Sequence, residues 1–255
     1  MYRFMSILKR DTLNLFLNPM WVILCIAFPF LFTTILGILT EGLYGTSVSS
    51  YDYYGVTMLV FSSLYAGTYS ANSFLEERIK QPNLRIAYSP ISSLFIPIAK
   101  IIATFLFTGV FFSFSGGLTH LFFDVNFGGR MLIFVWLLIL ALDLFFSCLG
   151  VLICCIFKSE GTANQVLSLI TAFLGLLSGL FFPVASLGKT MVSISNFSPV
   201  TKVLDTVFVM IYDQNYSQFL PVLLILLLLS LVTMVLIGFL FWNGNTFFDK
   251  NYKVL

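Results

Sequence analysis

The sequence predicts an all-α membrane protein with six transmembrane helices, an N-terminal amphipathic interfacial helix and a re-entrant outer segment before the last helix. Three observations support this fold class. Of the 255 residues, 59% are hydrophobic and only 9% are charged, whereas a soluble domain typically carries about 25% charged residues. Six apolar runs are each long enough to span a bilayer. Lys and Arg are also distributed unequally between the connecting segments.

The six apolar runs account for the domain organisation. A spanning helix needs roughly 20 apolar residues, so six of them leave room only for short loops, and we predict one membrane domain over residues 1–255. The second run is the least apolar because Ser, Thr and Asn residues interrupt it. Since lipid penalises unpaired polar groups, we expect this helix to face protein or a cavity. The runs are Met20–Leu39, Tyr54–Phe74, Leu94–Thr119, Met131–Phe157, Asn164–Phe182 and Phe219–Trp242.

The cations predict the orientation of these spans. Arg130, Lys189 and Lys202 fall on one side of the predicted membrane, and the other Lys and Arg residues fall on the opposite side. The latter group includes Lys100, which we assign to the loop after the second span. Cytoplasmic loops carry the excess of Lys and Arg, so both chain termini are predicted to be cytoplasmic.

Residues 2–17 form the predicted interfacial helix. A spacing of 100° per residue puts apolar and polar side chains on opposite faces, and a basic amphipathic helix of this kind lies in the membrane interface. The alternative is a solvated N-terminus. The apolar face comprises Phe4, Met5, Leu8, Leu15 and Phe16, and the opposite face comprises Arg3, Arg10 and Asn14.

The second segment that does not span the membrane covers residues 183–216. It is moderately apolar, contains Pro183 and Pro199, and is too long for a simple turn. We interpret it as short helices that dip into the outer leaflet.

Asp143 is the one carboxylate deep inside a predicted span. A charge at mid-bilayer is costly, so such a residue usually faces a partner or a water-filled cavity. A proton relay or a substrate contact is the functional interpretation. A hydrogen-bonded packing residue is the structural alternative, and the absence of a basic partner in any span favours it.

The sequence predicts no catalytic and no metal site. His120 is the only histidine, and Cys25, Cys148, Cys154 and Cys155 lie inside apolar runs, where we expect free thiols. Gly188-Lys189-Thr190 matches the end of a phosphate-binding loop, but Pro183 occupies the position of that motif's first Gly. The motif also requires a preceding strand. We therefore expect this chain to bind no ATP and no nucleic acid.

The order of these elements resembles the permease subunit of ABC-2 type transporters, the type V or ABCG-like exporters, over nearly the whole chain. Two groups of residues carry the resemblance, one around the loop after the second span and one between the fifth and sixth spans. They are Glu76-Glu77-Arg78, Leu84–Pro90 and Ile96–Lys100, and then Ser178–Pro183 and Ser195–Pro199.

The resemblance implies a set of partners. Such permeases pair with a second copy or a sister permease in the cell membrane, here predicted to be bacterial, and two separate ATPase subunits bind ATP and Mg²⁺. The loop 76–93 would be the coupling element that docks onto the ATPase. Positive-inside anchoring is the alternative role for its cations, but it does not explain its acidic pair. The coupling residues would be Glu76, Glu77, Arg78, Lys80 and Arg85.

The resemblance also implies a substrate path between the second and fifth spans. Phe181 and Phe182 would form its outer gate. The candidate path residues are Ser62, Ser63, Tyr65, Tyr69 and Asn72 on the second span, with Ser168, Thr171 and Phe173 on the fifth.

Two substrate classes remain open at this point. One is an amphipathic or hydrophobic molecule, such as a drug, an antimicrobial peptide or a lipid, which the 30 Phe residues favour. The other is a polysaccharide or teichoic-acid precursor. A different class of protein, an intramembrane enzyme or a structural membrane protein, is the remaining alternative. A paired nucleophile and base inside the spans would support the enzyme, and the sequence shows none.

Overall fold

The computed structural model describes residues 2–42, 48–75, 94–182, 184 and 188–242. Helices make up most of these ranges and no strand occurs in them, which confirms the all-α class. The elements are α1 (Tyr2–Phe16), α2 (Pro19–Leu39), α3 (Ser50–Leu64), α4 (Ala66–Leu75), α6 (Phe95–Phe123), η1 (Gly129–Met131), α7 (Leu132–Phe157), α8 (Glu160–Leu177), α9 (Lys189–Ser195), α10 (Pro199–Tyr212) and α11 (Phe219–Trp242).

Four of the described helices are long and apolar enough to cross a membrane: α2, α6, η1 with α7, and α11. The other two predicted spans correspond to α3 with α4, and to α8. The former is interrupted at Tyr65, which caps α3, and the latter has 18 residues and begins with the polar sequence Glu160–Gln165. The six-span count therefore stays a prediction.

Local sequence signals explain several helix ends. Asn18 accepts a hydrogen bond from the Met20 amide and precedes Pro19 at the first position of α2, where the missing N–H of proline costs nothing. Ser49 and Asp52 form a reciprocal capping box at the start of α3. At its C-terminus, α7 is capped by Lys158, whose backbone adopts the left-handed conformation with φ of 55°.

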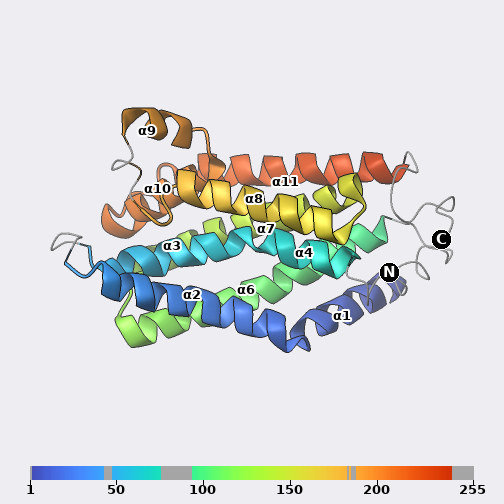
Figure 1. Ribbon diagram of the computed structural model, residues 1–255, viewed down its shortest axis with the longest axis horizontal. Coiled ribbons are helices and arrows are strands. Elements are labelled where there is room, and N and C mark those ends of the chain that lie inside the picture. Colours follow the sequence, from blue (N-terminus) through green and yellow to red (C-terminus); the bar gives the residue numbers. More distant parts are fainter. Residues whose placement is uncertain (1, 43–47, 76–93, 183, 185–187, 243–255) are drawn as a thin grey trace.

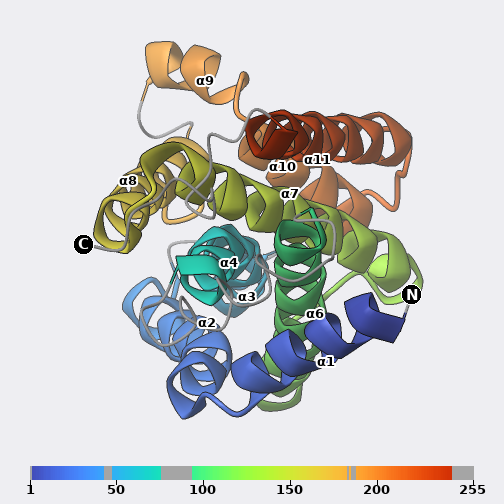
Figure 2. The same ribbon diagram turned by 90° about the vertical axis from the view of Figure 1, so that its right-hand side faces the viewer.

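Helix α7 lies at the centre of the bundle. It packs against α3, α4, α6, α8, α10 and α11, and the end-on view shows these helices arranged around it (Figure 2). Helices α2, α3 with α4, α6, α8 and α11 run roughly along the long axis (Figure 1). Helix α1 begins and α11 ends at the same end of the bundle, while α9 and α10 lie at the other end (Figure 1).

The closest helix crossing joins α4 to α7. A Cβ atom built on Gly150 would overlap the Gly67 carbonyl oxygen and the Ser70 hydroxyl. The Ser70 hydroxyl also donates a hydrogen bond of 2.8 Å to the Ser147 carbonyl oxygen on α7. Small residues permit this approach of two backbones, which is a common way to associate helices in lipid.

Helix α1 packs against α6, and its buried stripe differs from the predicted one. Ile7, Asp11 and Leu15 are buried, whereas Met5, which we expected on the apolar face, is 54% exposed. Lys100 is a second correction, because it lies inside α6 rather than in a loop. It is 1% exposed, and its Nζ atom is 2.6 Å from the Asp11 carboxylate. The helix thus uses its amphipathic face to bind the bundle.

The segment before α11 contains two short helices, as the sequence predicts. Helix α10 is amphipathic and buries Val200, Val203, Leu204, Val207 and Met210 in the main core cluster. It packs against α7 and, more lightly, against α3 and α11. Whether this segment re-enters the membrane stays a prediction.

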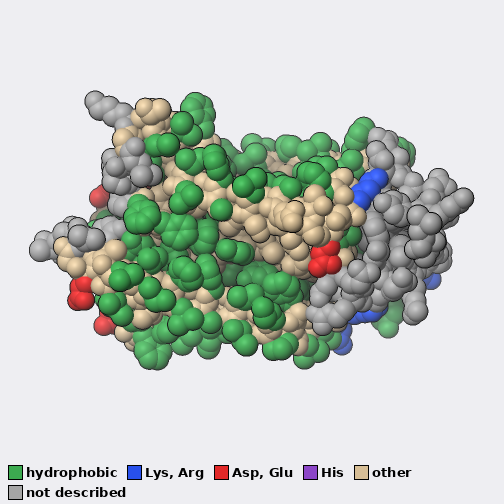
Figure 3. Space-filling model, viewed as in Figure 1, with side chains coloured by type: hydrophobic (Ala, Val, Ile, Leu, Met, Phe, Trp, Pro, Cys, Tyr) green, Lys and Arg blue, Asp and Glu red, His purple; other side chains and the backbone are tan. Residues whose placement is uncertain are grey.

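More of the described Lys and Arg residues lie at the α1 end of the bundle than at the α9–α10 end, where Arg130, Lys189 and Lys202 are found. The space-filling view shows Lys and Arg at the end where α1 begins, and acidic groups mostly at the opposite end (Figure 3). The acidic residues of the α9–α10 end are Glu41, Asp52, Asp124, Asp205 and Asp213. The larger number of Lys and Arg residues at the α1 end is what the positive-inside rule requires if that end is cytoplasmic.

We expect Gly150→Ala to destabilise the fold, because even a methyl group must push α4 and α7 apart. Overpacking of this kind typically costs about 1–3 kcal/mol. The four cysteines are free and buried, so a thiol-reactive dye reports unfolding of the detergent-solubilised protein. Gly238→Ala on α11 is the matched control, since a Cβ there meets nothing within 4 Å. Equal unfolding midpoints for the two variants would contradict the role given to this crossing.

Candidate functional site

The polar residues that we predicted to line a path on the second span are packed inside the chain. Ser62, Ser63, Tyr69 and Asn72 are all buried. The Ser62 and Ser63 hydroxyls donate to the carbonyl oxygens of the preceding turn, and the Tyr69 ring packs on those of Trp21 and Phe107. Within a single chain these residues therefore pack against other helices of that chain. Their part in transport stays a prediction.

The predicted residues of the fifth span divide between two faces of α8. Thr171 is buried, whereas Ser168 and Phe173 are exposed. The exposed residues recur every three or four positions and so form one stripe. The members of this α8 stripe are Gly161, Thr162, Gln165, Ser168, Leu169, Ala172, Phe173 and Leu176. The view of this side shows non-hydrophobic atoms over part of α8, within a mostly hydrophobic surface (Figure 3).

Helices α4 and α8 are joined by a pair of side-chain amides. The Asn164 Nδ2 atom donates to the Asn72 Oδ1 atom over 2.7 Å. A bond between two side-chain amides is the way to bury them in an apolar bundle without a large desolvation cost. It aligns α8 beside the polar half of the second predicted span.

An aromatic cluster lies along the same side of the bundle. The Phe61 ring is 5.4 Å from that of Tyr65 and 5.8 Å from that of Phe28. The predicted gate residue Phe181 joins this cluster, with its ring 4.9 Å from Phe61. Phe182, the other gate residue, is 56% exposed. The rings of Phe28, Tyr65 and Phe181 are partly buried and that of Phe61 is buried, and Phe61 and Phe181 lie against Gly175 on the buried face of α8.

Two tyrosines of α3 hold the backbone that carries the predicted gate. The Tyr53 hydroxyl donates to the Gly179 carbonyl oxygen over 2.5 Å, and the Tyr54 hydroxyl donates to the Phe181 carbonyl oxygen over 3.0 Å. Gly179 has φ of 77°, a conformation that glycine adopts without strain. This turn ends the fifth predicted span and returns Phe181 towards Phe61.

Asp143 is fully buried on α7, and its environment is polar on one side only. Its Oδ2 atom lies 2.8 Å from the Thr108 hydroxyl of α6, which also lies 2.7 Å from the Thr104 carbonyl oxygen. A hydroxyl carries one hydrogen, so both contacts are satisfied when Asp143 is a neutral acid that donates to Thr108. Its Oδ1 atom has no hydrogen-bond partner among the described residues. This geometry suits a packing residue.

The predicted coupling residues Glu76, Glu77, Arg78, Lys80 and Arg85 lie outside the described residues. The helices on either side of them are described. Helix α4 ends at Leu75 and α6 begins at Phe95, at the end of the bundle that also holds α1 (Figure 1). There, burial raises the pKa of the Asp11 carboxyl above its usual range, and the adjacent Lys100 ammonium opposes this rise.

Sequence reasoning missed the partners that fix these elements. The Asp11–Lys100 pair was not recognised because Lys100 was assigned to the loop after the second span and Asp11 was given no role. A signal was available for Asp11, since it falls between Ile7 and Leu15 at helical spacing. Tyr53 and Tyr54 gave no comparable signal, because their acceptors are backbone carbonyls more than a hundred residues away.

We expect Asp143→Asn to fold and transport nearly normally. The amide nitrogen of Asn can donate to the Thr108 hydroxyl in place of the neutral acid. Asp143→Leu removes the hydrogen bond between Asp143 and the Thr108 hydroxyl. It should therefore lower the free energy of unfolding by about 1–3 kcal/mol. Thr108→Val removes the same contact from α6 and is the matched comparison. A folded Asn variant that no longer transports would show instead that Asp143 relays a proton.

Comparison with known proteins identifies the family. No curated protein matches the chain. The family described as "ABC-2 family transporter protein" matches residues 39–239, which is well over half of the chain and includes α3 through α10 and most of α11. This family provides the noncatalytic transmembrane component of ABC transporters, and generally acts as a dimer with an ABC ATPase. The resemblance inferred from the sequence is confirmed, and the chain belongs to the ABC-2 family as a multi-pass permease.

Proposed function

We propose that this permease moves an amphipathic or hydrophobic molecule, such as a drug, an antimicrobial peptide or a lipid, out of the cell. It would do so as one of a pair of permeases, driven by separate ATPase subunits, with both of its termini in the cytoplasm. The observation that carries the proposal is the α8 stripe, together with the aromatic cluster beside it.

The α8 stripe is poorly suited to contact with lipid. Thr162, Gln165 and Ser168 are exposed on it, and an unpaired amide or hydroxyl in hydrocarbon costs several kcal/mol, on the order of 2–7. Gly161 and Ala172 on the same face permit close approach of another helix. A second permease, or the water-filled path between two permeases, would remove this cost.

The neighbouring aromatic cluster favours an apolar substrate. Phe28, Tyr65 and Phe181 are partly buried and offer aromatic surface with few polar atoms, and the buried Phe61 ring packs against all three. A pocket for an amphipathic ligand is typically mostly aromatic and aliphatic with a small number of polar groups. Gln165 and Ser168 on α8 would supply such groups. A sugar-polymer substrate would instead require many hydrogen-bonding side chains.

The pairing predicts a distinct cross-linking pattern. A photo-crosslinking side chain at position 168 should capture a second permease subunit, either another copy or a sister chain, in membranes from expressing cells. The matched control is position 228 on α11, where Leu228 is 61% exposed but no polar stripe surrounds it. Capture of a permease from position 228 and not from 168 would place the interface elsewhere.

The coupling role of the loop 76–93 makes a second prediction. Reversing Glu76 and Glu77 to Lys should weaken co-purification of the ATPase and abolish substrate-stimulated ATP hydrolysis, because reversing one side of a buried charge pair costs on the order of 2–5 kcal/mol. The unfolding midpoint of this variant should be the same as that of the wild type, since surface substitutions change the free energy of unfolding little.

The control for this prediction reverses the same number of charges at the other end of the bundle. Glu41 and Asp213 are both exposed there, and changing them to Lys should leave ATPase association intact. If the Glu76 and Glu77 variant also keeps its ATPase and full stimulation, the loop is only a charged anchor.

A further inference from the structure

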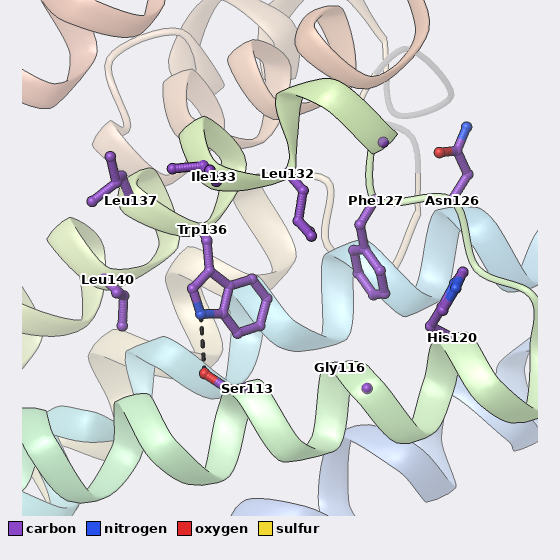
Figure 4. Close-up of a pocket in the computed structure, with 12 residues that line it drawn as sticks. Ser113, Gly116, His120, Asn126, Phe127, Leu132, Ile133, Trp136, Leu137 and Leu140 are labelled. Atoms are coloured by element: carbon purple, nitrogen blue, oxygen red, sulfur yellow. Dashed lines mark hydrogen bonds between the residues drawn. The ribbon is translucent and has the colours of Figure 1, made fainter.

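An open groove runs between α6 and α7 in the half of the bundle near α9 and α10. Its volume is about 600 Å³. The lining along its length is apolar, from Leu132 and Ile133 to Leu137 and Leu140 on α7 (Figure 4). Those positions rise about 12 Å along the helix at 1.5 Å per residue, which is the length of a substantial part of a lipid acyl chain rather than of a compact ligand.

Trp136 makes the groove more apolar than its composition suggests. Its indole Nε1 atom donates to the Ser113 hydroxyl over 3.0 Å (Figure 4), and the Ser113 hydroxyl in turn donates to the Gly109 carbonyl oxygen over 2.6 Å. The only polar atom of the indole is thereby satisfied, and the ring presents hydrocarbon. Both helices cross the membrane by length and composition, so this surface meets acyl chains.

The mouth of the groove, at the ends of α6 and η1, is polar. His120 Nδ1 lies 2.9 Å from the Val125 carbonyl oxygen, which can only accept, so Nδ1 carries a hydrogen, and in that tautomer of the imidazole Nε2 is an acceptor. The Asn126 Oδ1 atom accepts from the Gly128 amide, which leaves the Nδ2 amide to donate elsewhere. The exposed residues Asp124 and Arg130 add one charge of each sign nearby.

The groove is well placed for a lipid and poorly placed for a second permease. In the end-on view, α8 lies on one side of the bundle and the first turns of α7 lie on the opposite side (Figure 2). A partner seated on the α8 stripe would therefore leave the groove facing the bilayer.

We propose that this groove is a binding site for a zwitterionic phospholipid with a primary ammonium headgroup. One acyl chain lies along Trp136, Ile133 and Leu137. The ammonium is taken by His120 Nε2 and the phosphate by the Asn126 amide, both of which line the groove. The inference requires that α6 and α7 lie in a membrane, and it rests on the proposed function only in that a partner seated on the α8 stripe leaves the groove open; it does not depend on the proposed substrate.

Brominated acyl chains quench tryptophan fluorescence on contact, and Trp136 is one of only three tryptophans. The full chain with Trp21→Phe and Trp242→Phe is studied in detergent micelles. It retains only Trp136, which reports on the groove. Its matched control carries Trp21→Phe and Trp136→Phe and retains Trp242, which is 88% exposed and reports bulk lipid. Phosphatidylethanolamine with brominated chains is titrated into both at low mole fractions.

Quenching of Trp136 should saturate and should be reversed by unbrominated phosphatidylethanolamine, whereas quenching of Trp242 should rise in proportion to the lipid. Gly117→Leu should abolish the saturable part, because Gly117 lines the groove and a Cβ there meets nothing within 4 Å. Ile133→Ala, at a lining residue that is 70% exposed, should weaken binding without affecting the fold.

The headgroup assignment has its own readout. His120→Ala should weaken binding of phosphatidylethanolamine by roughly threefold to tenfold, as expected for one lost hydrogen bond. Brominated phosphatidylglycerol should bind more weakly than phosphatidylethanolamine, and tighter binding would overturn the zwitterionic assignment. Proportional quenching of Trp136, or saturable quenching that survives both Gly117→Leu and Ile133→Ala, would overturn the site itself.

Discussion

The contact between Gly67 and Gly150 brings α4 and α7 to backbone distance, and most of the bundle is arranged around that crossing. In lipid there is no hydrophobic driving force between two apolar helices, so close packing and interhelical hydrogen bonds must hold them. The absence of a Cβ on Gly150 allows the Ser70 hydroxyl to reach the Ser147 carbonyl oxygen. Helix α7 is thereby fixed against α4, and its remaining faces are available to α6, α8, α10 and α11.

Polar side chains in this bundle mainly connect helices to one another. Thr108 and Asp143 join α6 to α7, and Asn72 and Asn164 join α4 to α8. Each pair gives a partner to one polar atom of each side chain that would be costly in hydrocarbon if it were alone, while the Asp143 Oδ1 and Asn164 Oδ1 atoms have no hydrogen-bond partner among the described residues. The least apolar of the predicted spans is thus the most deeply buried in protein, as the sequence led us to expect, and polarity in this chain marks packing positions as well as possible transport positions.

The fold was predictable where it depends on local composition. Apolar run length placed α2, α6, α7 and α11 to within a few residues, and the capping residue Asn18 with Pro19 marked the start of α2. The break at Tyr65 was not predictable, because neither proline nor glycine marks it. Similarly, the sequence does not show which glycine meets another helix, and only the three-dimensional arrangement shows that Gly150 contacts the Gly67 backbone.

The candidate site was less predictable, for a physical reason. Sequence periodicity identifies which residues share a face of a helix, but not what lies opposite that face. Ser168 and Thr171 both belong to the predicted path and lie only about 60° apart around α8 at 100° per residue, yet one is exposed and the other buried, because the boundary of the packed face runs between them. The residues that carry the proposed function are consequently those left exposed once the single chain has packed.

The buried ion pair between α1 and α6 bears on how force would enter such a permease. The loop 76–93 connects α4 to α6, and both of these helices are fixed to α7, one by the glycine crossing and the other through Thr108 and Asp143. Lys100 lies in the second turn of α6 and holds α1 through Asp11. Removing one partner of a buried ion pair costs about 3–5 kcal/mol, so α1 and α6 should move together. A displacement of the loop by an ATPase would then act on α1, α4, α6 and α7 as one unit, and move that unit relative to the less tightly joined α8.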